Sequence, residues 1–230
     1  MKAKFVYPLL LVLILFFQAG AAWSANALVE DTREAIRLGQ YDRALKLLEA
    51  ALEENPLDTN AHLLMTEYYL AIQDYGSAEL STERTLVLNR SYTPLVAQAY
   101  YVAGERAMRR NQLPQALALY ETAVALDPAV RSRVRGKYLI IGNDLLTRGV
   151  FTTALSAYTQ EIGLNPAVKK TVAETVFLRG QSLLGSNDRS AEMLFSYAVS
   201  LDSSYGPKVA KTKVDYEQDL LSHAQAAPDE

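Results

Sequence analysis

The stretch from Gly39 to Pro56, GQYDRALKLLEAALEENP, decides how this chain folds. It begins with a glycine, places apolar and small residues three and four positions apart, and ends at Asn55-Pro56. This spacing predicts an amphipathic helix with one buried face. Proline cannot continue a helix but is favoured in the first turn of the next one, so the stretch predicts one helix and the start of another.

Variants of this stretch recur four more times along the chain. One small residue fills the same position in every copy: Ala44, Ala78, Ala116, Ala154 and Ala191. The successive spacings are 34, 38, 38 and 37 residues. A larger residue usually follows four positions later: Leu48, Thr82, Tyr120, Tyr158 and Phe195. In three copies a glycine stands in the preceding helix: Gly104, Gly142 and Gly180. A period of this length predicts helix pairs that each pack on their neighbours.

The repeated pattern resembles the tetratricopeptide repeat, whose period is about 34 residues. The resemblance implies an all-α, right-handed α-solenoid of about five helix pairs plus a C-terminal capping helix. We expect the solenoid over residues 28–203, with repeats at 28–58, 59–92, 93–129, 130–167 and 168–203. The capping helix is expected over 204–225 and a flexible tail over 226–230.

Helices within these repeats follow from the same periodicity. They are expected at 28–38, 41–54, 59–72, 75–88, 94–110, 113–126, 130–148, 151–164, 168–185 and 189–201. Repeats three to five have about four extra residues between the stop signal and the next helix, which is about one helical turn. We therefore expect their first helices to be longer than the family norm.

The N-terminal segment is typical of a secretory signal. Lys2 and Lys4 precede the mostly apolar run Phe5–Phe17, and Ala25-Asn26-Ala27 offers a cleavage site with small residues. The apolar run has 13 residues, whereas a membrane-spanning helix needs roughly 20. We interpret residues 1–27 as a signal peptide that directs the chain to the bacterial periplasm and contacts the membrane only transiently. An uncleaved N-terminal anchor and an earlier cleavage point are the alternatives.

Several kinds of chemistry are excluded by composition. The chain has no cysteine, which rules out disulfides, thiolate metal sites and cysteine nucleophiles. Its two histidines, His62 and His223, belong to no metal-binding or nucleophile motif, and no phosphate-binding glycine loop is present. We expect no enzyme activity, no metal and no cofactor. A net charge of −3 on an exported chain also argues against nucleic acid as a partner.

The resemblance implies a binding groove lined by the first helix of each repeat. The register places an apolar row at Leu63, Tyr101, Leu139 and Phe177, and a second at Leu70, Met108, Leu146 and Leu184. A polar row runs between them: Glu67, Glu105, Asn143 and Gln181. Such a groove would bind a peptide or protein of the cell envelope through apolar anchors. The alternatives are that these residues only pack, or that the C-terminal helix fills the groove.

Charge is divided unevenly along the chain. Residues 28–89 contain 12 acidic and 5 basic residues, whereas residues 90–213 contain 9 acidic and 16 basic ones. Part of the basic excess gathers where two helices are expected to begin: Arg131, Arg133, Arg135, Lys137, Lys169 and Lys170. This basic ridge would suit an anionic lipid or glycan, an acidic protein, or the acidic half of another copy. A solvated ridge without a ligand is the alternative.

Overall fold

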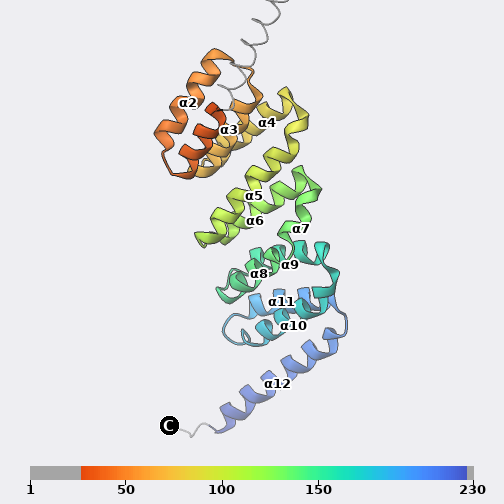
Figure 1. Ribbon diagram of the computed structural model, residues 1–230. Coiled ribbons are helices and arrows are strands. Elements are labelled where there is room, and N and C mark those ends of the chain that lie inside the picture. The colour runs from red at the N-terminus through yellow and green to blue at the C-terminus, as the bar shows by residue number, and fades with distance from the viewer. Residues whose placement is uncertain (1–26, 227–230) are drawn as a thin grey trace, which may run out of the picture. The chain divides into compact units, whose positions relative to one another are not determined.

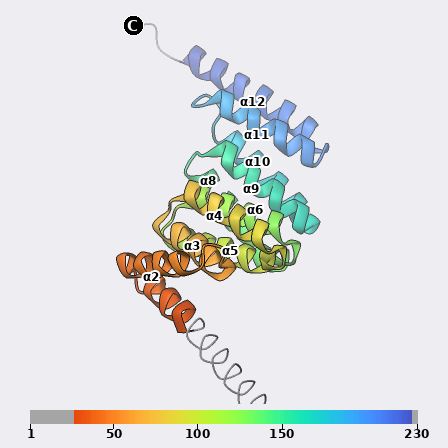
Figure 2. The same cartoon turned by 90° about the horizontal axis from the view of Figure 1, so that it is seen from above.

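The computed structural model describes residues 27–226, drawn from two directions in Figure 1 and Figure 2. Within that range the chain forms helices and turns and contains no strand. The predicted signal peptide lies outside the described residues except for its last residue, and so do residues 227–230 of the predicted tail. No helix within residues 27–226 is long and apolar enough to cross a membrane.

The described chain divides into two compact bodies. The N-terminal body contains the chain up to Arg110 together with Ala118–Val130, and the C-terminal body contains Asn111–Leu117 and the chain from Arg131 onward. We describe each body by itself.

The helices follow one another with short connections. The first covers residues 27–37. After it come α2 (Tyr41–Glu54), α3 (Thr59–Ile72), α4 (Tyr75–Leu88), η1 (Arg90–Tyr92), α5 (Thr93–Arg109), α6 (Leu113–Leu126) and η2 (Pro128–Val130). The remainder is α7 (Arg131–Val134), α8 (Lys137–Thr147), α9 (Phe151–Leu164), η3 (Pro166–Val168), α10 (Lys169–Gln181), α11 (Asp188–Leu201) and α12 (Tyr205–Ala226).

Helix pairing depends on the repeated small residue. All five alanines at this position are completely buried: Ala44, Ala78, Ala116, Ala154 and Ala191. A methyl side chain lets two helix backbones approach closely, and each alanine lies in the second helix of its pair. The pairs α3–α4, α8–α9 and α10–α11 pack along their length (Figure 1). The periodic alanine therefore marks the contact within each pair.

Four of the predicted helix ends are followed by a turn with the same local hydrogen bond. The side-chain oxygen of Asn55 accepts a hydrogen bond from the backbone N–H of Leu57 at 3.1 Å. The same contact, to the residue two positions on, is made by Asn89 at 3.0 Å and by Asp127 and Asp202 at 2.9 Å. Asn and Asp favour this local bond because their short side chains reach back to the backbone, which ends the helix.

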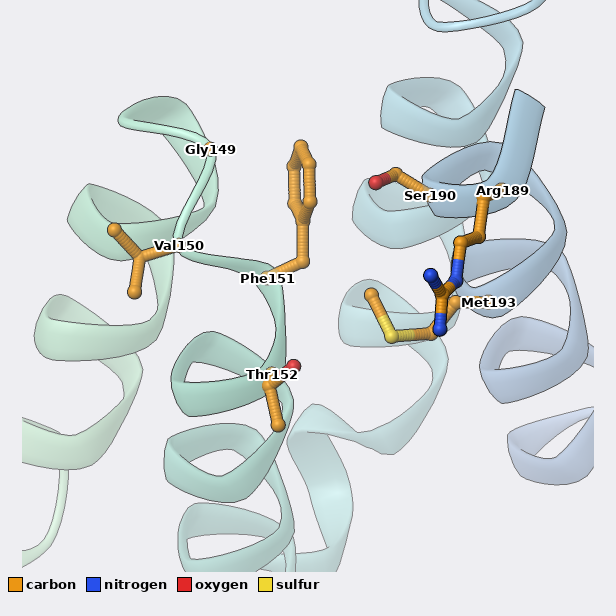
Figure 3. A pocket seen from close by; sticks show the side chains of 7 residues that line it. All are labelled: Gly149, Val150, Phe151, Thr152, Arg189, Ser190 and Met193. Carbon is orange, nitrogen blue, oxygen red and sulfur yellow. The ribbon is translucent and has the colours of Figure 1, made fainter. Parts of the chain in front are cut away.

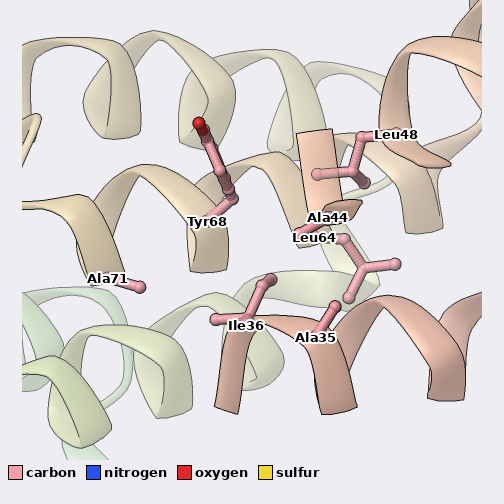
Figure 4. Close-up of a cluster of buried hydrophobic side chains, with 7 residues drawn as sticks. All are labelled: Ala35, Ile36, Ala44, Leu48, Leu64, Tyr68 and Ala71. Atoms are coloured by element: carbon pink, nitrogen blue, oxygen red, sulfur yellow. The ribbon is translucent and has the colours of Figure 1, made fainter. Parts of the chain in front are cut away.

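The core of the N-terminal body begins where its first three helices meet. Figure 4 shows Ala35 and Ile36 of the first helix facing Leu48 of α2 and Leu64 of α3, with Tyr68 beside them. These five side chains are at most 7% exposed. Burial of each large side chain contributes roughly 1.5–3 kcal/mol, so packing alone can hold this cysteine-free chain.

The expected lengthening of the first helices is only partly right. Helix α5 has 17 residues against 14 in α3, as expected, but α8 has 11 and α10 has 13. The extra residues of the later repeats instead form the 3₁₀ turns η2 and η3 and the short helix α7. Pro128 and Pro166 begin those turns, so the chain coils tightly before each α-helix starts.

The predicted helix over 130–148 is broken at Gly136. This glycine has φ +82°, a left-handed conformation that a helix interior cannot contain. Its backbone N–H donates to both carboxylate oxygens of Glu161, at 3.0 and 2.8 Å. Glu161 is buried in α9 at a position where other repeats have alanine or threonine. A buried carboxylate thus fixes the start of α8 and leaves α7 as a separate basic turn.

Candidate functional site

Three glycines let an aromatic ring lie flat on the first helix of a pair. A β-carbon at Gly104 would lie 2.6 Å from the ring of Tyr120. The corresponding distance is 2.7 Å from Gly142 to the ring of Tyr158, and 2.8 Å from Gly180 to that of Phe195. Any larger residue would overlap the ring, so glycine and aromatic residue form a matched pair.

The first two repeats lack both members of this match. They have Thr32 and Thr66 in place of glycine, and both are fully buried. The residues in the ring position are the smaller Leu48 and Thr82. The two hydroxyls each donate within their own helix, to the carbonyls of Leu28 and His62. In these two repeats the first helix therefore carries a larger side chain than glycine, and the second helix carries a smaller one than an aromatic ring.

The tyrosine hydroxyls hold the predicted polar row in place. Tyr120 donates a hydrogen bond to the Glu105 carboxylate, and Tyr158 donates to the side-chain oxygen of Asn143 at 2.7 Å. Burial raises the pKa of Tyr158, so this hydroxyl stays protonated and can donate. Phe195 has no hydroxyl, and Gln181 instead donates from Nε2 to the hydroxyl of Thr212 on α12 at 2.9 Å. Each of these polar groups is thus held at the surface of a first helix.

The predicted apolar rows lie largely inside the fold. Four of their side chains are buried: Leu63, Leu70, Leu146 and Phe177. The other four are half-buried: Tyr101, Met108, Leu139 and Leu184. Tyr101 packs against Tyr120 with ring centroids 5.7 Å apart, and Phe177 lies between Phe195 and Tyr205 at 5.8 and 5.1 Å. Much of their surface is therefore used for packing.

Two exposed apolar residues, Ile140 and Leu178, lie one position after Leu139 and Phe177 of the first apolar row and were not among the predicted site residues. Ile140 is 59% exposed and Leu178 is 54% exposed. They stand 38 residues apart, each two positions before its crossing glycine, so they are equivalent in successive repeats. Asn143 and Gln181 follow three positions later on the same helix face and are exposed too. The 38-residue spacing of two apolar residues beside the predicted row was the available signal.

The helices that carry them are neighbours in the C-terminal body. Arg179 of α10 donates from its guanidinium to the carbonyl of Thr147, the last residue of α8, at 3.5 Å. The same guanidinium lies 5.8 Å from the centre of the Phe151 ring. We call the four exposed residues Ile140, Asn143, Leu178 and Gln181 the α8–α10 face.

Comparison with known proteins agrees with this architecture. A family model described as a tetratricopeptide repeat matches residues 35–105. Residues 35–105 therefore match the tetratricopeptide-repeat family. The match covers most of the first repeat, the second repeat and the beginning of the third, and the predicted all-α fold of helix pairs is confirmed.

Solved structures similar to this repeat protein include those of MamA, YrrB and PilW. MamA is 19% identical over 76% of this chain and 96% of its own, with a TM-score of 0.35. YrrB, titled a TPR protein with an unusual peptide-binding site, is 18% identical over 80% and 90%, with a TM-score of 0.37. PilW, titled a widely conserved type IV pilus biogenesis factor, is 21% identical over 89% and 95%, with a TM-score of 0.35. No curated protein matches the sequence.

One residue of the predicted polar row, Glu67, forms an ion pair. Glu67 of α3 accepts from Arg33 of the first helix at 3.3 Å. Burial raises the pKa of Glu67 above its ordinary value, although Arg33 and, more weakly, Arg106 act to lower it. Glu30 adds a small effect in the raising direction. The folded chain therefore holds this proton more tightly than the unfolded chain does.

This shift predicts how Glu67→Gln changes stability with pH. Because the folded-state pKa is raised, the stabilising contribution of Glu67 is complete below its unfolded pKa of about 4.3 and is lost as pH rises through the folded value. Glutamine does not titrate, so the variant should gain stability relative to wild type over that window. Urea unfolding of both proteins between acidic and neutral pH measures the difference. If Glu67→Gln instead lost stability relative to wild type as the pH rises, the ion pair with Arg33 would outweigh the effect of burial.

The predicted basic ridge lies entirely in the C-terminal body. Arg131, Arg133 and Arg135 are exposed on and just after α7, and Lys137 is half-buried at the start of α8. Lys169 and Lys170 are exposed in the first turn of α10. Hydrogen bonds from Ser204 lower the pKa of Asp202, and Lys170 together with Lys208 of α12 acts in the same direction. Lysines of two helices therefore gather near one carboxylate.

A surface pocket of about 550 Å³ lies beside the turn between α8 and α9. Figure 3 shows Val150, Phe151 and Thr152 on one side and Arg189 and Met193 of α11 on the other. Helix α9 begins here without a side-chain cap, whereas α4 and α11 are capped by Asp74 and Asn187. The pocket was not predicted, because residues of two repeats line it.

The two histidines act locally. Nε2 of His62 lies 2.9 Å from the carbonyl oxygen of Pro56, and Nδ1 of His223 lies 2.8 Å from that of Asp219. Within residues 27–226 no three histidine or acidic side chains are grouped so that they could hold a metal ion.

Proposed function

We propose that this repeat protein is a non-catalytic scaffold that binds a partner protein or peptide through the α8–α10 face. The observation that carries the proposal is the exposure of Ile140 and Leu178, at 59% and 54%, at equivalent positions beside exposed amide side chains. Apolar side chains presented in this way suit the anchor residues of a peptide ligand.

The two amides complement a peptide backbone. The side-chain oxygen of Asn143 accepts from Tyr158, which leaves its NH₂ group to donate to a ligand. The NH₂ group of Gln181 donates to Thr212, which leaves its oxygen to accept. One donor and one acceptor on neighbouring helices match the C=O and N–H of an extended chain. We infer that the ligand is an extended segment with apolar side chains.

The same proposal covers the N-terminal body. There α5 presents the half-buried side chains of Val102 and Glu105 at the positions that correspond to Ile140 and Asn143, with the half-buried Tyr101 and Met108 of the predicted apolar rows beside them. Glu105 adds a carboxylate that would select a basic or N–H-donating group on the partner.

The location of this function is a proposal resting on the N-terminal sequence. A signal over residues 1–27 would bring the chain to the periplasm, where its partner would be an envelope protein or peptide. The absence of cysteine is compatible with an oxidising compartment, since no thiol can be mispaired there.

A second candidate function is binding of an anionic envelope lipid or polysaccharide by the basic ridge. The exposure of Arg131, Arg135, Lys169 and Lys170 favours it. Salt separates the two candidates, because binding by an exposed basic ridge weakens steeply with ionic strength and apolar anchoring does not.

The scaffold proposal is tested with peptides selected on the protein from a random library. Ile140→Glu with Leu178→Glu should weaken the selected peptides by more than about tenfold, because buried anchors dominate such interfaces. Calorimetric titration of each peptide into wild type and variant measures the loss.

The matched control is Leu80→Glu with Val87→Glu, which changes two apolar residues of α4 that are 68% and 78% exposed. Peptide affinity should survive that change. Peptides that bind the Ile140 and Leu178 variant as tightly as wild type, or that lose affinity only in the control, would contradict the proposal.

A further inference from the structure

The basic ridge continues along an edge of the C-terminal body where second helices end. Arg135, just after α7, donates from its guanidinium to the last carbonyl of α9 at 3.4 Å. Hydrogen bonds from Ser204 lower the pKa of Asp202, the residue after α11. Lys170 of α10 and Lys208 of α12 act on that carboxylate in the same direction, so both lie near it. Cations therefore follow the ends of α9 and α11 in successive repeats.

An acidic cluster occupies the end of the corresponding second helix in the N-terminal body. Glu49, Glu53 and Glu54 lie in the last two turns of α2, and all three side chains are exposed. Within residues 27–226 none of the three takes part in an ion pair. Leu57 follows three residues after α2 and is 59% exposed. We call these four residues the α2 edge.

Both clusters are placed against the dipole of their own helix. The negative end of a helix disfavours carboxylates, yet Glu53 and Glu54 lie in the last turn of α2, which contains no basic residue. The positive end disfavours cations, yet Lys169 and Lys170 begin α10, whose first turn contains no acidic residue. Helix stability therefore accounts for neither cluster, whereas contact with a surface of opposite charge accounts for both.

We propose that the basic ridge of one copy of the chain binds the α2 edge of a second copy. The two surfaces are complementary in charge, and each copy supplies one of each, so they are always present in equal number. Leu57 would pack on Pro166 and Ala167, which are exposed just before the lysines of α10. The contact joins two different patches and is therefore heterologous. This inference does not depend on the α8–α10 face.

Charge exchange tests the proposal in the full chain. Glu53→Lys with Glu54→Lys should remove the α2 edge, and Lys169→Glu with Lys170→Glu should remove the ridge. Sedimentation at low salt should show that each variant self-associates at least about tenfold more weakly than wild type. An equal mixture should associate again, because the intact ridge of the first variant meets the intact α2 edge of the second.

Two matched variants make the same change of charge elsewhere in the N-terminal body. Glu79→Lys with Glu83→Lys alters exposed residues of α4, and Arg109→Glu with Arg110→Glu alters exposed residues where α5 ends. Both should associate as wild type does, since only the position of the charges differs. Raising sodium chloride from about 0.05 M to about 0.5 M should weaken wild-type association at least about tenfold.

Cysteine substitution tests which residues meet, because the chain has no cysteine of its own. A Leu57→Cys chain mixed with an Ala167→Cys chain should form a mixed disulfide, which requires β-carbons about 3.5–4.5 Å apart. Neither chain alone should crosslink to itself. Val87→Cys, 78% exposed on α4, replaces Leu57→Cys in the control mixture and should not crosslink.

Three results would overturn the proposal. One is a wild-type chain that stays monomeric at low salt and about 1 mM, where even weak specific complexes form, whether or not its ridge binds anionic phospholipid vesicles. Another is a mixture of the two charge-exchanged variants that remains monomeric. The third is a loss of association in the matched variants as large as in the test variants.

Discussion

Gly142→Ala is expected to lower the free energy of unfolding by about 1–3 kcal/mol. The added β-carbon would lie 2.7 Å from one ring carbon of Tyr158 and 2.8 Å from the next. The ring cannot move away easily, because it is completely buried and its hydroxyl is bonded to Asn143. Chemical unfolding of wild type and variant, monitored by circular dichroism, measures the loss.

Gly163→Ala is the matched control for this substitution. Gly163 lies in α9 of the same body, and a β-carbon there would meet nothing within 4 Å. Alanine is the better helix former by roughly 0.8–1.0 kcal/mol, so this variant should be more stable than wild type. Equal behaviour of the two variants would show that the glycine–tyrosine contact has no energetic role.

A second substitution shows whether the loss comes from the ring. Adding Tyr158→Leu to Gly142→Ala imitates the first repeat, where Leu48 stands at the ring position and Thr32 at the glycine position. The double variant should be more stable than the sum of the single effects predicts, by about 0.5–3 kcal/mol. Strict additivity would mean that the two positions do not interact.

Ala154→Leu is expected to cost about 1–3 kcal/mol and to exceed the effect of Gly142→Ala. Ala154 is completely buried at the repeated small position, and leucine adds three carbons where the fold leaves no space. The same change at Ala50, which is exposed on α2, should be nearly neutral. Comparing urea midpoints of the two variants checks the repeat register. A neutral Ala154→Leu would contradict that register.

The helices of the repeats could be predicted closely from the sequence. The expected ranges for α2, α3, α4, α6 and α9 agree with the structure, because apolar periodicity and strong stop signals occur together in them. The Asn55 and Asp127 turns are local interactions, made within two residues of the stop. Local signals of this kind can be read without knowing the fold.

The break at Gly136 could not be predicted in the same way. The residues around it, from Arg131 to Lys137, are compatible with a continuous helix. The carboxylate that holds the Gly136 N–H comes from Glu161, 25 residues later. Only the packing of α9 against the start of α8 brings these groups together, so local propensity gave the wrong helix.

The predicted apolar rows lie on the helices that carry Ile140 and Leu178, but the first row is one residue away from these exposed side chains. Periodicity identifies which residues share a helix face, but the partner helix decides which face is covered. Phe195 packs on Phe177 of α10, whereas Ile140 and Leu178 are left in solvent. The polar residues Asn143 and Gln181 are exposed and stay within the proposed site.

The central claim is that the α8–α10 face, and not the outer surface of the second helices, contacts the partner. It is tested most directly by placing a photo-crosslinking residue, one position at a time, in living cells at Ile140, Leu178, Leu80 or Val87. We expect one discrete adduct from Ile140 and Leu178, lost when Asn143→Ala and Gln181→Ala are added, and none from Leu80 or Val87. Adducts from Leu80 and Val87 alone would contradict the account.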